Sequence, residues 1–382
     1  MSPDPTSADT AGQAGTEAHT QVVGVELGRE RYDIHVGTGL LGRLGELVPA
    51  RANARAVLVT CDGLPREYVI NCLTSLEAAG WAVSSFVVPD GEQSKSLAQA
   101  SRIYEHCLDN GLDRGGTVFA LGGGVVSDLA GFVAATYMRG VAFVPVPTTL
   151  LSQVDASVGG KTAVDLPRAK NVVGAFHQPV AVVIDVDTLT TLPEREFRSG
   201  MAEVVKHAAI ADADLFRELE SRDGRDLRQD AGELVEVVAR NCRIKADVVI
   251  SDPREEGLRA CLNFGHTIGH ALEIAASGWG LRHGEAVALG MVAESEMAVR
   301  LGLAEPEVPR RLRALLQAHG LADRVVRWDP EAARAAISHD KKVVNGRLRL
   351  PLVPAIGQVT VTEDVAVAEL LNALDGLLLA GG

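Results

Sequence analysis

The most constraining feature of this sequence is a regular alternation of short apolar runs with segments of helical period between residues 56 and 186. The apolar runs are rich in β-branched residues and predict buried strands, whereas apolar residues spaced three or four apart predict helices. Strands that alternate with helices form a parallel sheet with helices on its faces. The expected strands are 56–60, 82–89, 117–121, 141–147 and 181–186, and the expected helices are 68–80, 97–111 and a segment from the glycines at 122–124 to Met138.

The period of the sequence changes near residue 190. From Pro193 onward most segments have helical spacing, and a short strand pair at 347–362 and a last helix close the chain. Residues 21–37 alternate apolar and polar side chains, which predicts a hairpin. We therefore expect a disordered tail (1–20), a Rossmann-like parallel-sheet nucleotide-binding domain (21–192) and a mainly α-helical domain (193–382), with the cleft between the domains. The expected helices of the second half are 195–210, 213–221, 231–250, 259–276, 284–302 and 307–319.

Composition excludes several classes of protein. No run of about 18 apolar residues predicts a membrane span, and the first 20 residues lack the basic start and apolar core of a signal peptide. The five cysteines are scattered and form no CxxC pair, which is typical of buried thiols in a reducing cytoplasm. A net charge of −13 argues against nucleic acid as a partner. An anionic substrate would therefore need a local basic pocket.

A glycine turn lies between an expected strand and an expected helix, in TVFALGGGVVSDLAG. Glycines let the backbone approach a pyrophosphate, and the following helix N-terminus offers free N–H groups and the positive end of its dipole. The spacing is not GxGxxG, so a tight strand-to-helix turn is an equal alternative. The segment DGEQSK at 90–95 also follows a strand, and on its own it fits an ordinary polar loop.

Histidines and a carboxylate recur in three segments of the second half: AEVVKH, NFGHTIGH and RHGEAV. His266 and His270 are four apart and share one face of a helix, so with Glu203 they suit a metal that takes nitrogen and oxygen ligands. Thr267 follows His266, so this is not the HExxH motif of a zinc protease. Three protein ligands leave a position open for substrate. Spacing leaves open which histidines bind and favours His266 with His270 over His283; packing or capping histidines are the alternative.

Cations gather around the same segments of an acidic chain. Lys206 follows Glu203 by three residues on one helix face, and Arg259 and Asn263 precede His266 by seven and three residues, which predicts that they share its side of the helix. Any one of these could be a solvated surface charge, but jointly they favour a substrate with a phosphate or carboxylate. The candidate residues are Lys161, Lys170, Asn171, Lys206, Lys245, Arg259 and Asn263.

Taken together, these motifs resemble the 3-dehydroquinate synthase family, and the similarity is strongest from about Asp90 to Glu285. So many collinear motifs make the resemblance far more specific than any one of them. The segments that carry it are DGEQSK at 90–95, GGGVVSDLAGFVAATYMRG at 122–140, VPTTLLSQVDASVGGKTAVD at 146–165, KNVVGAFHQP at 170–179, TLPEREFRSGMAEVVKH at 191–207, LNFGHTIGHALE at 262–273 and RHGEAVALGM at 282–291.

The resemblance implies an NAD-dependent lyase that converts 3-deoxy-D-arabino-heptulosonate 7-phosphate to 3-dehydroquinate and phosphate in the shikimate route. The family oxidises a secondary alcohol transiently with NAD⁺, which makes the neighbouring proton acidic. Phosphate is then eliminated and can act as its own base, the ketone is reduced back, and the opened ring closes by an aldol step. NAD⁺ is regenerated in each turnover and stays bound.

The resemblance also implies residue roles. The metal ligands would be Glu203, His266 and His283, with zinc or cobalt as the ion, and His270 would contact the substrate phosphate. Arg139 matches an arginine that reaches into the partner subunit's site, which implies a homodimer. The other substrate-binding positions are Lys161, Asn171, Lys206, Lys245, Arg259 and Asn263, with a phosphate contact from Lys341 or Lys342.

Positions that match NAD contacts lie in four short segments and at three single residues. This chain departs from the family pattern at Ser127 and His207, where glycine and tyrosine are common, and the adenine-ribose position falls on Cys61 or Asp62. The expected NAD contacts are Asp90, Gly91, Glu92, Gln93, Ser94, Lys95, Gly123, Gly124, Val125, Val126, Ser127, Asp128, Thr148, Thr149, Asp155, Lys161, Lys170, Thr188, Leu189, Thr190 and Thr191.

Three alternatives remain open at the level of sequence. The nearest is another sugar phosphate cyclase of the valiolone, deoxy-inosose or amino-dehydroquinate type; VGGKTAVD with Arg259 favours the dehydroquinate type over the first two. A metal-dependent alcohol dehydrogenase resembling glycerol dehydrogenase would share the two-domain plan but would not need the lysine cluster. A non-catalytic homologue would not need to keep the metal and lysine sets.

Overall fold

The fold was examined in a computed structural model that describes residues 19–28, 30–253, 257–276, 280–321, 328–338, 343–344 and 347–379. Lys341 and Lys342, expected at the substrate phosphate, lie outside the described residues. Residues 1–18 of the expected tail also lie outside them, and the first strand begins at Thr20, inside the segment assigned to the tail.

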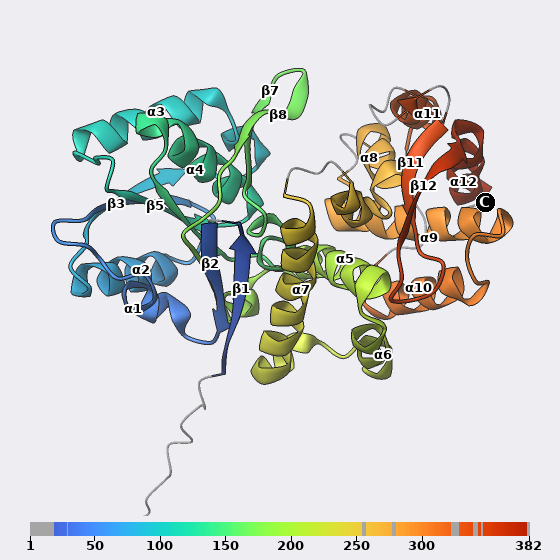
Figure 1. Ribbon diagram of the computed structural model, residues 1–382, viewed down its shortest axis with the longest axis horizontal. Helices are drawn as coiled ribbons and strands as arrows, with labels where there is room; N and C mark the ends of the chain where they lie inside the picture. The colour runs from blue at the N-terminus through green and yellow to red at the C-terminus, as the bar shows by residue number, and fades with distance from the viewer. Residues whose placement is uncertain are drawn as a thin grey trace, which may run out of the picture.

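A parallel sheet forms the centre of the first half, and its strand order is β4-β3-β5-β6. Alternate residues of β3 face opposite cores: Val57 and Val59 pack with α3 and α4, whereas Leu58 packs with α1 and α2. Figure 1 shows the two pairs of helices on opposite sides of the sheet. The elements are β3 (Arg55–Cys61), β4 (Ala82–Val88), β5 (Thr117–Gly122), β6 (Ala142–Pro147), α1 (Leu44–Leu47), α2 (Arg66–Ala78), α3 (Leu97–Asp109) and α4 (Gly124–Thr136). The expected strands and helices of this half are confirmed.

Two hairpins complete the first half. The hairpin expected at 21–37 is confirmed as β1 (Thr20–Leu27) and β2 (Glu30–Gly37), and β2 also pairs in parallel with β9 (Ala181–Asp185). A second antiparallel hairpin, β7 (Lys161–Leu166) and β8 (Ala169–Phe176), was not predicted from the Gly-rich stretch that holds it. It projects beside α4 toward the helical half (Figure 1). Several candidate substrate residues lie on this hairpin.

The second half is mainly helical, as predicted. Its core is continuous with the β1–β2 hairpin, because Val23 and Val25 of β1 share one apolar cluster with Val204 of α5 and Val238 of α7. The helices are α5 (Glu194–Ala211), α6 (Ala213–Ser221), α7 (Ala231–Ser251), α8 (His266–Ala275), α9 (His283–Arg300), α10 (Glu307–Ala318), α11 (Pro330–Ser338) and α12 (Val367–Leu379), and the strands are β10 (Val343–Val344), β11 (Arg347–Leu352) and β12 (Thr360–Ala366). The β1–β2 hairpin therefore links the first half to a core of the second half.

One expected helix was wrong. Residues 259–276 were predicted as a continuous helix, but a 3-10 turn (Leu258–Asn263) ends before α8 begins at His266. Gly265 between them has φ +79°, a left-handed conformation that breaks the helix and that glycine adopts without steric cost. Arg259 and Asn263 therefore do not share a helix face with His266.

Three helices approach one another unusually closely around this break. A Cβ at Gly284, in the first turn of α9, would overlap with the carbonyl oxygen of Ser199 on α5. A Cβ at Gly290, one and a half turns further along α9, would overlap with the carbonyl oxygen of Gly265. The backbone N–H of Gly284 also donates a hydrogen bond to Ser199 Oγ at 3.0 Å. The first turn of α9 is thereby held against α5, and the start of α8 is held against α9.

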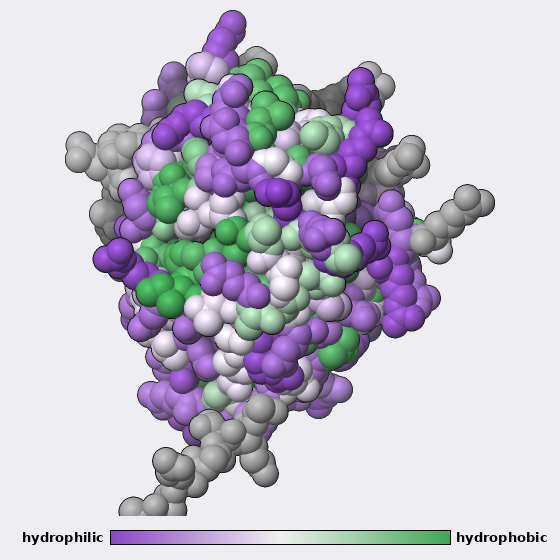
Figure 2. Space-filling model, turned by 90° about the vertical axis from the view of Figure 1, so that its left-hand side faces the viewer, coloured by the Kyte–Doolittle hydropathy of each residue, from purple (hydrophilic) through white to green (hydrophobic). Residues whose placement is uncertain are grey.

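Figure 2 shows the outer end of the first half, where apolar surface lies between polar side chains. Strand β4 is an edge of the parallel sheet, and its Val87 side chain is 51% exposed. Within the described part of the chain, no helix combines the length and apolar character needed to cross a membrane.

The close approach of α5 and α9 gives a stability prediction. Gly284→Ala should lower the free energy of unfolding by about 1–3 kcal/mol or more, because the added methyl group meets backbone that cannot move aside like a side chain. Chemical denaturation followed by circular dichroism measures the change. Gly376→Ala in α12 is the matched control, since nothing lies within 4 Å of its Cβ position; an equal effect of both substitutions would contradict the packing argument.

Candidate active site

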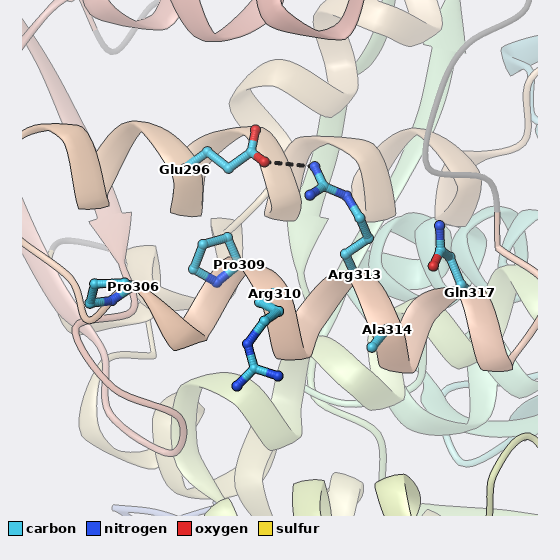
Figure 3. A pocket seen from close by; sticks show the side chains of 7 residues that line it. All are labelled: Glu296, Pro306, Pro309, Arg310, Arg313, Ala314 and Gln317. Carbon is cyan, nitrogen blue, oxygen red and sulfur yellow. Dashed lines mark hydrogen bonds and ion pairs between the residues drawn. The ribbon is translucent and has the colours of Figure 1, made fainter. Parts of the chain in front are cut away.

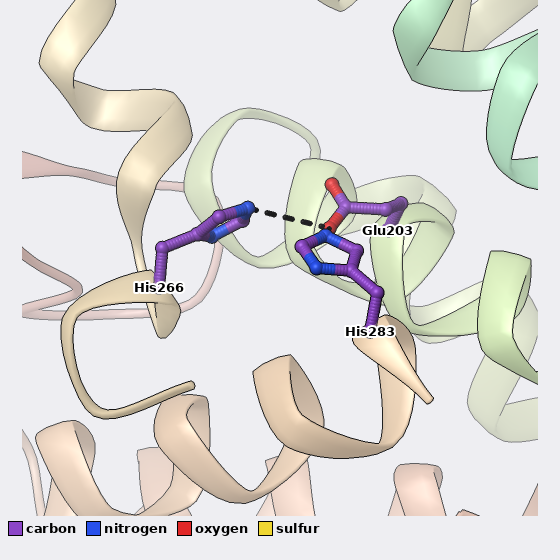
Figure 4. A group of neighbouring side chains, drawn as sticks. All are labelled: Glu203, His266 and His283. Atoms are coloured by element: carbon purple, nitrogen blue, oxygen red, sulfur yellow. Dashed lines mark ion pairs between the residues drawn. The ribbon is translucent and has the colours of Figure 1, made fainter. Parts of the chain in front are cut away.

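Three side chains from three helices meet at one point. Glu203 comes from the middle of α5, His266 is the first residue of α8 and His283 is the first residue of α9. The Nε2 atom of each histidine lies 3.7 Å from the same oxygen, Oε1 of Glu203 (Figure 4). This separation is too long for a hydrogen bond but close to the ~3.4 Å expected between two ligands that lie ~2.1 Å from one tetrahedral metal ion.

The two imidazole rings are turned so that their Nε2 atoms face the carboxylate. His266 donates its Nδ1–H to the backbone carbonyl oxygen of Phe264 at 3.1 Å, and His283 donates its Nδ1–H to Glu273 Oε1 at 3.1 Å. A hydrogen bond from the second ring nitrogen fixes the tautomer that metal-binding histidines need. Oε1 of Glu203 is buried and accepts no hydrogen bond, so a cation would satisfy it. The donor set therefore fits a divalent metal.

The charges of these groups depend on one another. Burial opposes ionisation of Glu203, but Lys206 and the two histidines hold its pKa well below the ordinary value. Burial and the charge of Lys206 also keep the pKa of His266 well below the ordinary value, which leaves this ring neutral. Burial opposes a charge on His283, but Glu203 and Glu273 outweigh it and raise its pKa to about 10. Without metal, His283 therefore carries a proton that a metal ion would have to displace.

Two lysines bring positive charge to the same place. Lys206 is buried and forms an ion pair with Glu203 Oε2, one turn before it on α5. Lys245 of α7 is also buried and forms an ion pair with Asp155 Oδ1 at 2.6 Å. Asp155 was expected to contact NAD, but the structure pairs it with this cluster. Burial alone would raise the pKa of Asp155, and the charges of Lys245 and Lys206 outweigh burial and lower it. Arg259 is buried nearby and donates to Gly159 O at 3.3 Å, so three of the candidate cations line one region.

His207 is also buried in this region. The sequence analysis assigned it no role. Its Nδ1–H donates to Asn241 Oδ1 at 3.1 Å, and its Nε2 lies 4.0 Å from Asp155 Oδ1. Burial, followed by the charge of Lys206, lowers the pKa of His207 to about 4, so the ring is neutral. Asp155, Glu203 and His207 could in principle hold a cation. Lys206 and Lys245 already neutralise both of those carboxylates, which disfavours a second ion there.

The pair of histidines favoured by spacing is not the pair that shares Glu203. His270 is exposed on α8, with its ring centre 5.4 Å from that of His266 and 6.2 Å from that of His283. It belongs to a different group of neighbours, with Glu273 and His283. The carboxylate of Glu203 instead lies close to the ring nitrogens of His266 and His283, with one potential ligand atom of each residue within 4.8 Å of the others. The spacing argument failed because it could not see that α9 begins beside α8.

A buried carboxylate that sequence reasoning missed supports His266. Glu294 of α9 is fully buried and accepts hydrogen bonds from Gly265 N at 2.8 Å and Ile268 N at 3.2 Å. These N–H groups are among those that a helix N-terminus leaves without partners, so Glu294 caps α8 from a neighbouring helix. His266 is thereby fixed at the first position of α8. Its sequence signal, a lone Glu in an apolar helix, is too weak to identify this role.

The expected NAD-binding segments follow the carboxyl ends of parallel strands. Residues 90–95 follow β4, 123–128 follow β5, and Thr148 and Thr149 follow β6. In open α/β sheets, ligands bind in the crevice outside this edge. The buried Gln153 side chain connects the end of β6 to the 188–191 segment. Its Nε2 donates to Pro147 O at 3.2 Å and to Thr188 Oγ1 at 3.1 Å.

Several of these residues contact one another. Lys95 is buried and bonds to Asp128 Oδ2 at 2.5 Å and to Asn171 Oδ1. Lys170 lies 3.3 Å from Glu92 Oε1 and is exposed, as is Lys161. The β7–β8 hairpin therefore meets the 90–95 loop directly. Asn171 has φ +58°, a left-handed conformation that is uncommon outside glycine.

The glycine turn has room for a ligand. A Cβ at Gly124, the first residue of α4, would meet only Ala156 Cβ at an ordinary 3.6 Å, and Gly124 does not have positive φ. The described residues therefore do not themselves require glycine here. The N-terminus of α4 is thus open to a phosphate group, which fits the dinucleotide expected at this turn.

A separate hollow of about 460 Å³ lies along α9 and α10 and holds none of the predicted site residues. Glu296 and Arg313 form a 2.7 Å ion pair on its wall, and the side chain of Arg310 points away from this pair (Figure 3). Its lining includes charged and polar side chains but contains no histidine and no lysine, and the ligand-like groups described above gather elsewhere.

Comparison with known families now identifies the relationship. The model of the 3-dehydroquinate synthase N-terminal region matches residues 85–199, and the model of the C-terminal region of the same enzyme matches residues 200–343. The chain belongs to the 3-dehydroquinate synthase family. The family resemblance drawn from the motifs is thus confirmed.

Individual members of the 3-dehydroquinate synthase family cover almost the whole chain. The 3-dehydroquinate synthase of Symbiobacterium thermophilum is 51% identical over 346 residues, which is 90% of this chain and 96% of that protein. Among solved structures, 2-deoxy-scyllo-inosose synthase with carbaglucose-6-phosphate, NAD⁺ and Co²⁺ has a TM-score of 0.85 at 25% identity, covering 93% and 99% of the two chains. The 2-epi-5-epi-valiolone synthase of Streptomyces hygroscopicus subsp. jinggangensis, with NAD⁺ and Zn²⁺, has a TM-score of 0.82 at 29% identity and the same coverage.

The charge on His283 leads to a prediction about metal binding. At pH 7.5 the metal-free chain should release about one proton for each Zn²⁺ bound, because His283 is protonated and His266 is neutral. Apparent affinity should therefore rise about tenfold for each pH unit between roughly pH 6.5 and 8.5, well below the raised pKa of His283. Isothermal titration calorimetry in buffers of different ionisation enthalpy measures both quantities.

Two substitutions serve as controls for this titration. His270→Ala should bind Zn²⁺ with unchanged proton release, whereas His283→Ala should lose tight binding. The reverse pattern would restore the pair that spacing favoured, His266 with His270.

Proposed function

We propose that this chain converts 3-deoxy-D-arabino-heptulosonate 7-phosphate into 3-dehydroquinate and phosphate, with NAD⁺ and one divalent ion, zinc or cobalt, as cofactors. The observation that carries the proposal is the convergence of Glu203, His266 and His283 beside the buried cations Lys206 and Lys245. It is supported by 51% identity to a 3-dehydroquinate synthase over 90% of the chain. Two related cyclases were solved with NAD⁺ and with Co²⁺ or Zn²⁺.

When bound, NAD⁺ takes a hydride from a substrate carbon and returns it later, and the divalent ion polarises the substrate's alcohol oxygens. Glu203, His266 and His283 would hold that ion, leaving part of its coordination open to the substrate. The segments at 90–95 and 123–128 would hold the dinucleotide at the carboxyl edge of the sheet. Each cofactor is thus supported by one half of the chain.

The buried cations have a distinct task. Lys206, Lys245 and Arg259 are buried, and a positive charge shielded from water attracts a carboxylate or phosphate more strongly than one in water does. Each is anchored, by Glu203, Asp155 or Gly159 O, so their positions are set before the substrate arrives. Fixed cations of this kind orient a charged substrate and stabilise negative charge as it develops.

The exposed candidates would complete the phosphate end of the site. His270 lies beside the metal ligands on the solvent side of α8, and Lys161 and Asn171 lie on the exposed β7–β8 hairpin. We propose that these residues, together with Asn263, contact the substrate. The two buried carboxylates of this region, Asp155 and Glu203, are weak bases, because the neighbouring lysines lower the pKa of both. Elimination with the leaving phosphate as its own base fits that arrangement.

We also propose a homodimer in which Arg139 enters the partner's site. Met138 and Arg139 are exposed and have φ of +50° and +68°, two consecutive left-handed residues that are not glycine. Such strain costs on the order of 1–3 kcal/mol per residue and is typically kept where function requires it. The turn projects these two side chains away from the core of their own chain.

The remaining parts of the proposal concern organisation and location. We propose the domain boundary at 192/193, between the 3-10 turn that follows β9 and the start of α5 at Glu194. The five cysteines are buried and unpaired, which supports the proposed cytoplasmic location. The amino-dehydroquinate enzyme is the nearest alternative function, because its substrate would use the same cations.

The proposed reaction can be tested directly. The purified protein with NAD⁺ and Zn²⁺ or Co²⁺ should release phosphate from the heptulosonate phosphate without net formation of NADH, since the hydride is returned in each turnover. Phosphate release and absorbance at 340 nm measure the two outcomes, and the amino analogue of the substrate is assayed in parallel. Net NADH would favour a glycerol-dehydrogenase-like enzyme, and preference for the analogue would favour the amino variant.

A shared site at the dimer interface has a quantitative consequence. Arg139→Ala and His283→Ala should each be nearly inactive alone. In a dimer that carries one copy of each, one of the two sites has both residues, so random co-expression should recover about a quarter of wild-type activity. Turnover of the co-expressed sample measures this, and no recovery above the single variants would contradict sharing.

A further inference from the structure

We propose that Glu273 is a positioning residue for the metal ligand His283, and that its carboxylate fixes the orientation of the imidazole ring. This inference rests on the metal site of the proposed function and adds a residue outside its ligand set of Glu203, His266 and His283. Glu273 Oε1 lies 3.1 Å from His283 Nδ1, on the side of the ring opposite Glu203. The ring thus lies between two carboxylates, one for each nitrogen.

Only one orientation of the ring satisfies both carboxylates. Rotation of the ring by about 180° exchanges Nδ1 with Cδ2 and Nε2 with Cε1, so a flipped ring would present carbon atoms to Glu203 and Glu273. The hydrogen bond to Glu273 is lost in the flipped state. In the orientation that keeps this bond, Nε2 faces Glu203 Oε1 at 3.7 Å.

The two histidines differ in what holds them. The ring of His266 is fixed by the backbone carbonyl oxygen of Phe264, two residues away on its own segment. The main chain of His283 is fixed at the start of α9, through Gly284 N and Ser199 Oγ. Among the described residues, no backbone carbonyl oxygen accepts a hydrogen bond from the His283 ring. The orientation of the ring therefore depends on a side chain from another helix, Glu273.

Helix α8 supplies both the first ligand and this partner. Glu273 follows His266 by seven residues and His270 by three, so all three lie on one face of the helix. The face of α8 that presents His266 to Glu203 therefore also presents Glu273 to His283. A shift of α8 would disturb both imidazoles together, which explains why Glu294 and the glycine contacts fix this helix so firmly.

A second cation is the competing explanation for Glu273. His270, Glu273 and His283 bring one ligand atom each within 4.8 Å of one another. An ion there would have to replace the proton on His283 Nδ1 while Nε2 remained on the first ion, which removes both protons from one ring. A neutral ring with Nδ1–H donated to a carboxylate is the ordinary arrangement around a metal-binding histidine. The geometry therefore favours positioning.

The test compares three variants of the full chain by metal affinity. Metal-free wild type, Glu273→Ala, Glu273→Gln and Glu196→Gln are titrated with Zn²⁺ against a chromophoric chelator. Glu273→Ala should weaken binding by about 10- to 100-fold. Glu273→Gln should lose less, because an amide oxygen still accepts the Nδ1–H bond. Glu196→Gln is the matched control: Glu196 is paired with Arg282, next to His283, at 3.1 Å, and its loss should leave the affinity unchanged.

A spectroscopic readout separates positioning from a general loss of structure. With Co²⁺ in place of Zn²⁺, the visible absorption of Glu273→Ala should differ from that of wild type in position and intensity, and Glu273→Gln should lie nearer to wild type. Circular dichroism of the metal-free proteins should be the same for all variants.

Several outcomes would overturn the proposal. Wild-type affinity and an unchanged cobalt spectrum in Glu273→Ala would show that the ring needs no such partner. Two Zn²⁺ per wild-type chain and one per Glu273→Ala chain, with the remaining affinity unchanged, would make Glu273 a ligand of a second ion. Absence of Zn²⁺ binding by the wild type would instead refute the metal site of the proposed function, and this inference with it.

Discussion

The buried carboxylate of Glu203 is the interaction on which the rest of the structure depends. A lone charged carboxylate in a protein interior is costly and persists only where cations and hydrogen bonds compensate it. Here Lys206 compensates one oxygen, and two histidines face the other. The histidines are the first residues of α8 and α9, so the starts of these two helices bring both rings to the carboxylate. The glycine contacts between α5, α8 and α9 then make that convergence sterically possible.

The first half of the chain meets this centre through a few buried polar contacts. Asp155 and Gly159, which follow the parallel sheet, are held by Lys245 of α7 and by Arg259. The carboxyl edge of the sheet, with its glycine turn, therefore faces the cations that surround Glu203. A substrate bound between them would reach groups from both halves, which is what a reaction with one dinucleotide and one metal requires.

Local patterns in the sequence predicted most of the fold but only part of the site. The strands β3, β4, β5, β6 and β9 and the helices α5, α6, α7, α9 and α10 have strong periodicity, and the structure has them nearly where expected. The β7–β8 hairpin was missed because β8 is largely exposed and the glycines Gly159 and Gly160 directly precede β7. The break at Gly265 was missed because helical spacing continues across it. Spacing could place His266 and His270 on one face, but only tertiary packing brings His283 to Glu203. Family resemblance supplied His283 as a candidate ligand, and the roles of Glu273 and Glu294 became visible only in the structure.

The origin of the three candidate ligands on three separate helices has a consequence for the life of the protein in the cell. An ion that binds the folded chain and not the unfolded one contributes folding free energy by thermodynamic linkage, about 2.7 kcal/mol at a free concentration of 100 times its Kd. That amount is a large share of the net stability of an ordinary domain. Metal supply would then control not only turnover but also how much of the chain escapes proteolysis, so that metal starvation would reduce the amount of enzyme as well as its activity.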